Sequence, residues 1–448
     1  MNEKSKTYYA LSSPPGRSAT STIRISGEKS IESLAKLTNL KQHRFVHGKT
    51  RLCDIYNNNK SLIDKAVVVY YRAPRSYTGE DLVEIHTHGN PLIVQSVFNE
   101  LSGFGLRVAD PGEFTRAAYL NNKIDLVQAE AVFSLINSQT IGGVSLSIDN
   151  AVGTLSSHIK NLRSSFVVTL SHLEYELDIS DLDNHKKTEK RIEKEINKLM
   201  RSINDLLKSY NNSKLLQEGL RIVIVGESNA GKSTLFNSLL GRDRAIVTNK
   251  PGTTRDVIEG SIHMSNYSII LVDTAGFRKT KEPIEKEGIK KTNLEIEGAD
   301  LIYQILDPTT SSTLKTPNYR PKTITLFNKV DLLNKQTKNT LKKTNKNALF
   351  ISAKYNTGIK KLRHKTAQII TSNTTQKESI YITSKRQHAL LLSVMRELEQ
   401  ASNIGSKNQL ELISIHLREA IKHFDWLVGK TSTDDILNKI FSDFCVGK

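Results

Sequence analysis

One stretch limits what this chain can fold into more than any other part of the sequence. Residues 226–233 read GESNAGKS, which fits the phosphate-binding pattern G-x-x-x-x-G-K-[ST] at every fixed position. A β-branched apolar run comes directly before it, and residues 234–240 have the pattern of a helix. A glycine-rich loop between a strand and a helix surrounds a β-phosphate with backbone N–H groups. The sequence therefore predicts a nucleotide site in an α/β domain, with Lys232 on the β- and γ-phosphates and Ser233 Oγ on Mg²⁺.

Four later motifs complete the predicted nucleotide site and indicate which base it binds. In chain order they are GTTRD at 252–256, DTAG at 273–276, NKVD at 328–331 and SAK at 352–354. We expect Asp273 to hold Mg²⁺ through water and the Gly276 N–H to bind the γ-phosphate. The Asp331 carboxylate accepts from guanine N1–H and N2–H₂ together, whereas adenine would leave the buried charge unpaired. Five motifs in this order predict a P-loop GTPase domain of the Ras-like class.

The sequence leaves the hydrolytic residue open. Ras-type proteins carry a water-orienting glutamine after D-x-x-G, but this chain has Phe277, whose ring cannot position water. The charged segment that follows offers three candidates, Glu282, Glu285 and Glu287. An arginine finger from the same chain is a further alternative, supplied by Arg255 or Arg278.

Length and composition set further limits. A chain of 448 residues has room for two to four domains, each with its own core. The net charge of +18 has two explanations, a polyanionic partner such as RNA or a general abundance of lysine on solvated faces. No run of about eighteen apolar residues and no apolar signal core near Met1 occur, so we expect a cytoplasmic protein. Cys53 and Cys445 are too few for a disulfide framework or a zinc site.

The patterns along the chain indicate an insertion. The N-terminal part reads as an α+β domain, with a helix at 91–101 and strand-like runs at 22–25, 66–71 and 82–86. Strand signals then vanish, and helical periodicity covers 129–138, 155–177 and 192–210. After the α/β segment, which ends near residue 372, helices are predicted at 387–400, 410–428 and 433–441. A helical domain interrupted by an α/β insert is the economical interpretation, since two separate helical pieces would each lack a core.

Short motifs spread over the whole chain resemble one family. They are PPGR at 14–17, RISG at 24–27, YTGED at 77–81, HG at 88–89, PGEFTRA at 111–117, NKIDL at 122–126, QAEA at 128–131 and FCVGK at 444–448. With the nucleotide motifs, they make essentially all of the chain similar to MnmE, also called TrmE, the family of bacterial and organellar tRNA-modification GTPases. The resemblance implies a multidomain protein: an α+β folate-binding and dimerisation domain, an all-α helical domain in two parts, and an inserted G domain. The corresponding bounds are 1–118, 119–215 with 376–448, and 216–375.

The resemblance also assigns roles around the nucleotide. The implied GTP contacts are Asn229, Ala230, Gly231, Lys232, Ser233, Thr234, Thr248, Asn249, Lys250, Pro251, Gly252, Thr253, Thr254, Asp273, Thr274, Ala275, Gly276, Asn328, Lys329, Asp331, Ser352, Ala353 and Lys354. The implied Mg²⁺ ligands are Ser233 and Thr254. The implied K⁺ ligands are Asn229, Thr248, Lys250 and Thr253. In the family K⁺ replaces an arginine finger when two G domains associate, because it neutralises charge beside the phosphates. Of the three glutamates, the resemblance selects Glu285 as the catalytic residue.

A second implied site binds 5-formyl-tetrahydrofolate or a related reduced folate. Its contacts map onto Arg24, Glu84, Lys123 and Lys448. A carboxylate suits the amide-like edge of a pterin, and cations suit the glutamate tail of folate. The terminal motif also contains Cys445, a candidate nucleophile whose alternative is an inert thiol.

The implied partners are a second copy of the chain, tRNA, and the FAD-dependent protein MnmG (GidA) in a heterotetramer or larger complex. With MnmG, the family adds an aminomethyl or carboxymethylaminomethyl group to carbon 5 of the wobble uridine of certain tRNAs. The alternative is a binding switch, such as an Era-like or EngA-like ribosome-assembly GTPase. Those proteins carry a KH-type domain after the G domain, whereas residues 373–448 show only amphipathic helices. The sequence therefore favours an enzyme that hydrolyses GTP in tRNA modification.

Three positions depart from the family pattern. Asn90 stands where a second glycine is common, Val446 replaces isoleucine, and residues 308–321 are short for the usual helix. We expect the folate site to tolerate the first two. His86 and His88 alternate on one predicted strand, but no third ligand accompanies them, so packing at the strand end is favoured over a metal site.

Overall fold

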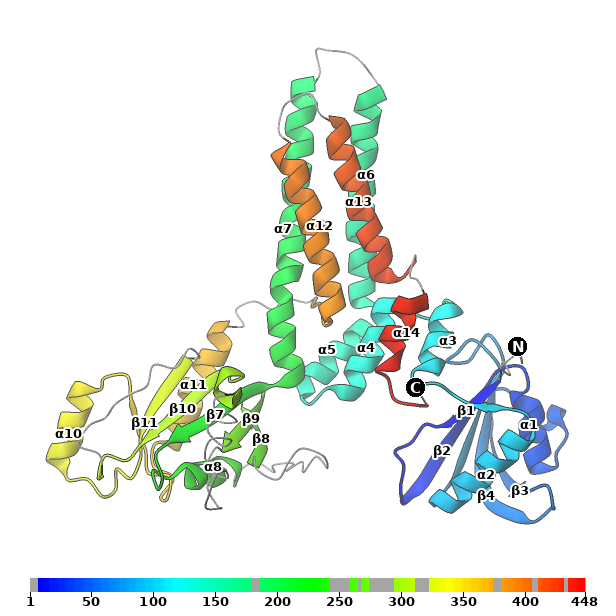
Figure 1. Ribbon diagram of the computed structural model, residues 1–448, viewed down its shortest axis with the longest axis horizontal. Helices are drawn as coiled ribbons and strands as arrows, with labels where there is room; N and C mark the ends of the chain where they lie inside the picture. Colours follow the sequence, from blue (N-terminus) through cyan, green and yellow to red (C-terminus); the bar gives the residue numbers. More distant parts are fainter. Residues whose placement is uncertain are drawn as a thin grey trace, which may run out of the picture. The chain divides into compact units, whose positions relative to one another are not determined.

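The chain divides into two compact units, each built from segments that are far apart in the sequence (Figure 1). The computed structural model describes residues 7–178, 185–241, 258–264, 267–273, 294–310, 322–373, 380–404, 410–430 and 434–447. Unit 1 consists of Met1–Phe133, Asp149–Asn204 and Ser384–Lys448. Unit 2 consists of Ser134–Ile148 and Asp205–Thr383. Within the described ranges, no helix combines the length and apolar composition that a membrane span needs.

The N-terminal part of unit 1 contains a six-stranded sheet in the order β3-β4-β5-β2-β1-β6. The strands are β1 Tyr8–Leu11, β2 Ser18–Ser26, β3 Thr50–Tyr56, β4 Leu62–Tyr71, β5 Leu82–Gly89 and β6 Arg107–Val108. The accompanying helices are α1 Ser30–Thr38, η1 Gln42–Arg44, α2 Pro91–Gly103 and α3 Glu113–Leu120. All neighbouring strands are antiparallel except β1 and β6, which are parallel.

Side-chain alternation explains how this sheet forms a core. Ile23 and Ile25 of β2 are fully buried, and they pack in one cluster with Leu34 of α1 and Val97 of α2. Arg24 between them points to the opposite face. The predicted strands at 22–25, 66–71 and 82–86 and the helix at 91–101 are confirmed, with longer bounds. Strands β1, β3 and β6 and helices α1 and α3 were not predicted.

The departure at residue 90 has a structural reason. Asn90 is the N-cap of α2, where its side chain accepts a hydrogen bond from the Leu92 N–H at 2.9 Å. Pro91 follows at the first helical position, where its missing N–H costs nothing. Asparagine therefore starts the helix better than the glycine common in the family, because glycine has no side-chain acceptor.

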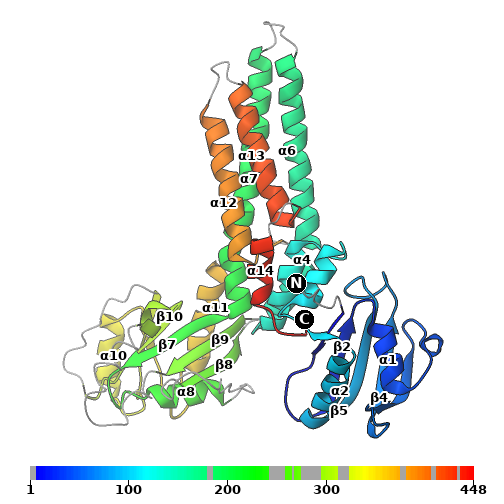
Figure 2. The same ribbon diagram turned by 45° about the vertical axis from the view of Figure 1, so that its right-hand side comes forward.

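Helices form the rest of unit 1, and three of them extend into unit 2. They are α4 Leu126–Asn137, α5 Ile141–Ala151, α6 Thr154–Asp178, α7 His185–Glu218, α12 Lys385–Asn403, α13 Leu410–Val428 and α14 Asp434–Ser442. Helix α13 packs between α6 and α12 (Figures 1 and 2). The rings of Phe166 and Phe424 meet edge to face at 5.0 Å. The Arg163 guanidinium donates twice, both at 2.9 Å, to the Asp425 carboxylate.

The helices that periodicity predicts in this part of the chain are confirmed, and one helix between them was missed. Helix α5 was not predicted, and α7 is longer at both ends than the pattern at 192–210. After residue 380, the described residues form α12, α13 and α14 and contain no strand. This agrees with the expectation of helices in place of a KH-type domain.

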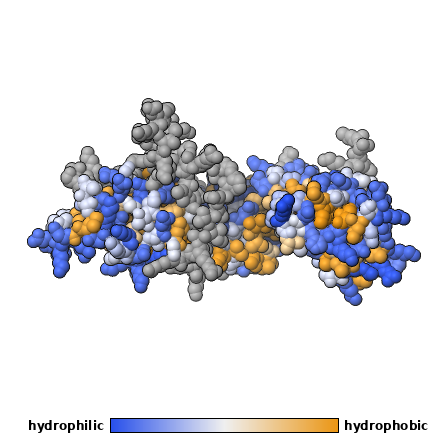
Figure 3. Space-filling model, turned by 90° about the horizontal axis from the view of Figure 1, so that it is seen from below, coloured by the Kyte–Doolittle hydropathy of each residue, from blue (hydrophilic) through white to orange (hydrophobic). Residues whose placement is uncertain are grey.

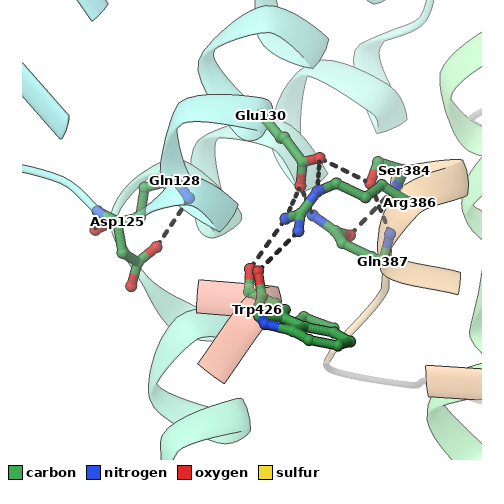
Figure 4. A network of polar contacts seen from close by, with 8 residues as sticks. Asp125, Gln128, Glu130, Ser384, Arg386, Gln387 and Trp426 are labelled. Atoms are coloured by element: carbon green, nitrogen blue, oxygen red, sulfur yellow. Dashed lines mark hydrogen bonds and ion pairs between the residues drawn. The ribbon is translucent and has the colours of Figure 1, made fainter. Parts of the chain in front are cut away.

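A buried carboxylate joins three of these helices in unit 1. Figure 4 shows Glu130 of α4 facing the first residues of α12. It accepts from Arg386 Nε at 2.7 Å, from Gln387 Nε2 at 2.7 Å and from Ser384 Oγ at 3.2 Å. Arg386 also donates to the carbonyl of Trp426 at 3.0 Å. Helices α4, α12 and α13 are thereby held together at the point where the chain re-enters unit 1.

Unit 2 contains a second six-stranded sheet, in the order β12-β11-β10-β7-β9-β8. The strands are β7 Leu220–Gly226, β8 Ile258–Met264, β9 Tyr267–Asp273, β10 Leu301–Leu306, β11 Lys322–Phe327 and β12 Leu349–Phe350. The helices are α8 Lys232–Leu240, α10 Lys335–Thr344 and α11 Ile359–Asn373. All pairs are parallel except β8 with β9.

The position of β7 determines where a ligand binds in unit 2. Ile222, Val223 and Ile224 are fully buried, as expected for a strand covered on both faces. Strand β7 is central, with β10 on one side and β9 on the other. In open parallel sheets, ligands bind at the carboxyl ends of strands where the strand order reverses. The carboxyl end of β7 is the glycine-rich loop.

Candidate functional site

The glycine-rich loop turns sharply from β7 into α8. A side chain at Gly226 would collide with the carbonyl of Ile305, and one at Gly231 would collide with Asn328 Nδ2. Gly231 also has φ +97, in the left-handed region that favours glycine. Asn229 has a left-handed backbone too, with φ 64, which asparagine tolerates better than most residues. Gly226 and Gly231 are therefore needed because neighbouring atoms leave no room for a side chain at either position.

The lysine of the loop is held by the loop itself. Lys232 is buried, and its Nζ donates to the carbonyls of Gly226 at 2.9 Å and Glu227 at 2.8 Å. This ammonium lies at the first residue of α8, where the helix dipole is positive. Two positive features side by side favour the binding of an anion such as a phosphate.

An oxygen pair next to the loop suits a magnesium ion. Ser233 Oγ donates to Asp273 Oδ2 at 2.7 Å, and the Asp273 side chain is buried at the end of β9. Hydroxyl and carboxylate oxygens are the donors that Mg²⁺ prefers. The third predicted participant, Thr254, lies outside the described residues.

One asparagine links the loop to the predicted base-recognition segments. Asn328 Nδ2 donates to the Ala230 carbonyl at 2.8 Å, and the Ala353 N–H donates to Asn328 Oδ1 at 3.0 Å. Asn328 is itself buried, and its N–H donates to the Leu306 carbonyl at 2.9 Å. The three motifs GESNAGKS, NKVD and SAK are thereby held in one arrangement, with Asp331 exposed beside them.

The lysine of NKVD has a partner that the sequence did not reveal. Lys329 Nζ lies 2.6 Å from Oδ2 of Asp307, the residue after β10. Burial favours the neutral form of Asp307, but hydrogen bonds from Lys329 and Thr309 outweigh it and lower the pKa of this carboxyl. Lys329 has φ 56, so the pair also holds a left-handed backbone. No local pattern in the sequence indicates this pair, because it forms through the parallel pairing of β10 with β11.

The predicted nucleotide contacts gather at one edge of the sheet where the structure describes them. Those at the ends of β7, β9, β11 and β12 are Asn229, Ala230, Gly231, Lys232, Ser233, Thr234, Asp273, Asn328, Lys329, Asp331, Ser352, Ala353 and Lys354. The rest lie outside the described residues: Thr248, Asn249, Lys250, Pro251, Gly252, Thr253, Thr254, Thr274, Ala275 and Gly276. So do the candidates for hydrolysis, Arg255, Phe277, Arg278, Glu282, Glu285 and Glu287.

Two predicted folate residues meet on the face of the N-terminal sheet that is turned away from α1 and α2. Arg24 of β2 pairs in register with Glu84 of β5, and Arg24 Nε lies 2.8 Å from Glu84 Oε1. Tyr77, which the sequence reasoning did not assign, is close by. Burial raises the pKa of the Tyr77 phenol, and the Thr115 hydroxyl and the Arg24 charge offset part of this rise. The signal for Tyr77 is its place in the YTGED motif.

Of the other two predicted folate residues, the structure describes only Lys123. Lys123 Nζ donates to the carbonyl of Pro74 at 3.0 Å. Lys448 lies outside the described residues. Cys445 is exposed near the C-terminus, and its carbonyl accepts from the Gly112 N–H at 3.4 Å.

The two strand histidines have ordinary partners. His88 Nδ1 lies 2.7 Å from Asp64 Oδ1, and His86 Nδ1 lies 3.0 Å from Thr22 Oγ1. Within the described ranges, no group of three or more His, Cys, Asp and Glu residues could hold a metal ion.

Two family models together match most of the chain. The MnmE helical domain matches residues 126–445, and the N-terminus of the GTP-binding protein TrmE matches residues 7–123. The chain belongs to the MnmE family. A relative named tRNA modification GTPase MnmE, from Fervidobacterium nodosum, is 38% identical over 99% of this chain and 97% of its own length. The MnmE relative from Aquifex aeolicus is 34% identical over 98% of this chain and 99% of its own length.

Membership of the MnmE family agrees with the resemblance inferred from the motifs. It also agrees with the predicted fold class, because both sheets and the helical part are present. The coverage shows that the match extends beyond the nucleotide-binding residues, which occur in many GTPases. Family membership makes the chain a tRNA modification GTPase of the MnmE type.

Proposed function

We propose that this chain hydrolyses GTP to drive a tRNA modification carried out jointly with the FAD-dependent protein MnmG. The modification adds an aminomethyl or carboxymethylaminomethyl group to carbon 5 of the wobble uridine, position 34 of certain tRNAs. The protein acts in the cytoplasm as a homodimer and binds MnmG in a heterotetramer or larger complex. The curated relatives support the tRNA part of this proposal, because their names describe tRNA modification.

The observation that carries the GTP part is the double hydrogen bond of Asn328. It holds the phosphate loop and the SAK segment at fixed positions, so that Asp331 and the backbone of the SAK segment are set to meet a guanine while Lys232 meets its phosphates. The GTP contacts are the residues named from the sequence. Ser233 and Thr254, with Asp273 acting through water, would hold Mg²⁺, which would supply positive charge at the β- and γ-oxygens.

Hydrolysis in this proposal depends on a monovalent cation and on Glu285. Asn229 is exposed on the phosphate loop. Its amide oxygen would bind K⁺ together with Thr248, Lys250 and Thr253, which lie outside the described residues. Bound K⁺ would supply the charge that an arginine finger supplies in other GTPases. Hydrolysis should therefore be faster in K⁺ than in Na⁺, and Asn229→Ala should remove the difference. Equal rates in the two salts with the unaltered protein would contradict the cation proposal.

The N-terminal domain is proposed to bind a reduced folate such as 5-formyl-tetrahydrofolate. Arg24 and Glu84 supply a cation and a carboxylate on one sheet face, with Lys123 and Lys448 as further cations. Calorimetry should give weaker folate binding for Arg24→Ala. Arg44→Ala, which removes an exposed arginine from η1, is the control and should bind normally.

Mass analysis of tRNA nucleosides tests the whole function. Cells that lack the protein should lose the modified wobble uridine and regain it when the unaltered gene is restored. The Lys232→Ala variant should fail to restore it, whereas Lys361→Ala, which removes an exposed lysine of α11, should succeed. Normal modification in cells that lack the protein would refute the proposed function.

A further inference from the structure

The positive charge of the chain is concentrated in one segment of unit 2. Residues 332–377 contain ten lysines and one arginine and no aspartate or glutamate. Eleven of the eighteen net positive charges therefore lie in 46 of the 448 residues. A general abundance of lysine would spread the charge more evenly, so the distribution favours the other explanation, a polyanionic partner.

Most of the lysines on helix α10 are exposed to solvent. Lys335, Lys342 and Lys343 of α10 and Lys346 in the turn after it are all exposed, and α10 contains no buried residue. Figures 1 and 2 show α10 at an edge of unit 2, and Figure 3 shows mainly hydrophilic side chains at this edge. We call these four residues the lysine patch.

One further lysine adds positive charge beside the lysine patch, and no described carboxylate neutralises that charge by an ion pair. Lys365 of α11 donates from Nζ to the carbonyl of Asn347 at 2.6 Å, which brings a fifth ammonium next to Lys346. No ion pair joins a lysine of the patch to any carboxylate of the described residues. On α7, in contrast, lysines alternate with acids, and Lys208 Nζ lies 3.9 Å from Asp205. The patch therefore keeps its positive potential.

Helix stability explains only part of the patch. Cations stabilise the C-terminal end of a helix, where Lys342 and Lys343 lie. Lys335 is the first residue of α10, where the helix dipole disfavours a cation, and the first turn has no acidic residue. The cap of this helix is Asn334, which accepts from the Thr337 N–H at 2.8 Å and needs no lysine. The charge at Lys335 thus has no structural use in the helix.

We propose that the lysine patch binds the phosphate backbone of RNA, so that unit 2 contacts the tRNA directly. This inference rests on the proposed function for the identity of the RNA. Ten helical residues span about 15 Å, enough for several successive phosphates. Lysine binds phosphate as a point charge without reading sequence, so the contact positions the tRNA and leaves its selection to other parts of the complex. A membrane surface fits less well, because α10 has one leucine and no apolar face to insert.

A triple variant tests the patch in the full-length protein. Lys335→Gln, Lys342→Gln and Lys343→Gln remove three charges and keep residues of similar helix propensity on an exposed helix. The matched control is Lys194→Gln, Lys198→Gln and Lys208→Gln, which removes three exposed lysines of α7. Anisotropy of a fluorescein-labelled, unmodified tRNA transcript is measured over a series of KCl concentrations, with GTP hydrolysis as a check on unit 2.

The patch variant should bind the tRNA transcript at least about tenfold more weakly near 0.1 M KCl. The slope of the logarithm of its association constant against the logarithm of the KCl concentration should be smaller in magnitude by about 2 to 3. The α7 variant should stay within about twofold of the unaltered protein. Both should hydrolyse GTP normally, since neither set touches the nucleotide site.

Several results would overturn the proposal. They are a patch variant with unchanged tRNA affinity, an equal loss of tRNA affinity in the two variants, or an unaltered protein that does not bind the transcript. A patch variant that binds tRNA normally but no longer binds vesicles containing phosphatidylserine would assign the patch to membranes and also overturn it. GTP hydrolysis and the tRNA nucleosides of cells report on the proposed function separately, so its failure is distinguishable from failure of the patch.

Discussion

Asn328 Nδ2 donates a hydrogen bond to the carbonyl of Ala230 at 2.8 Å, which joins the base-recognition segment to the phosphate loop. The same side chain accepts from the Ala353 N–H at 3.0 Å. Asn328→Ala removes both bonds and leaves a buried N–H and carbonyl unpaired, at a cost of about 2–4 kcal/mol. Affinity for a fluorescent GDP analogue should fall at least about tenfold, because the two halves of the pocket separate. Asn339→Ala, an exposed change on α10, is the control and should bind the analogue normally.

Gly231 offers a test of close packing in the phosphate loop. Gly231→Ala introduces a methyl group that collides with Asn328 Nδ2, and it also carries the strain of φ +97. Gly105→Ala, at φ +79 with open space around it, carries the strain alone and is the matched control. Urea unfolding should give a loss of about 1 kcal/mol for Gly105→Ala. Only Gly231→Ala should also abolish nucleotide binding, and normal binding by that variant would contradict the described loop.

Glu130 is predicted to carry much of the stability of unit 1. Glu130→Gln leaves the partly buried Arg386 guanidinium without its carboxylate, so the free energy of unfolding should fall by about 2–4 kcal/mol. Chemical denaturation measures this change. Glu32→Gln, in an exposed pair with Lys36, should change the unfolding midpoint little, because solvent screens the pair. Equal effects of the two substitutions would show that the Glu130 network does not stabilise unit 1.

The ion pair of Asp307 with Lys329 predicts a pH dependence. Because the folded pKa of Asp307 is lowered, its contribution is complete above the ordinary pKa of about 3.9 and is lost as pH falls through the lower folded value. Asp307→Asn should lower the free energy of unfolding by about 1–3 kcal/mol at pH 7. In acid, the variant and the unaltered protein should have the same free energy of unfolding. Urea unfolding over a pH series checks this. Asp54→Asn, in an exposed pair with Lys65, should show no such convergence.

The nucleotide site was largely predictable because each motif is local in sequence. The GESNAGKS pattern predicts the loop between β7 and α8. The later described motifs each follow a strand of the same sheet, so their order along the chain also predicts where they lie. The partner of Lys329 was not predictable, because Asp307 comes near only once β10 and β11 pair in parallel. The same holds for Arg24 and Glu84, which meet through the register of β2 and β5.

Helix α5 was missed for a physical reason. Its two glycines, Gly142 and Gly143, lower helix propensity, so the segment reads as a loop. A side chain at Gly143 would lie 2.8 Å from Cα of Gln217 and 2.9 Å from the carbonyl of Leu216. The glycine is therefore needed for close approach to the end of α7, a contact between segments some seventy residues apart that no local pattern reveals.

Base recognition by Asp331 is the central claim, and nucleotide selectivity of Asp331→Asn tests it most directly. Binding of GTP and XTP is measured by calorimetry on the unaltered protein and the variant. An amide cannot accept from both guanine N1–H and N2–H₂, so the variant should bind GTP at least about a hundredfold more weakly and prefer XTP. A variant that keeps tight GTP binding and rejects XTP would contradict the assignment of this pocket to guanine.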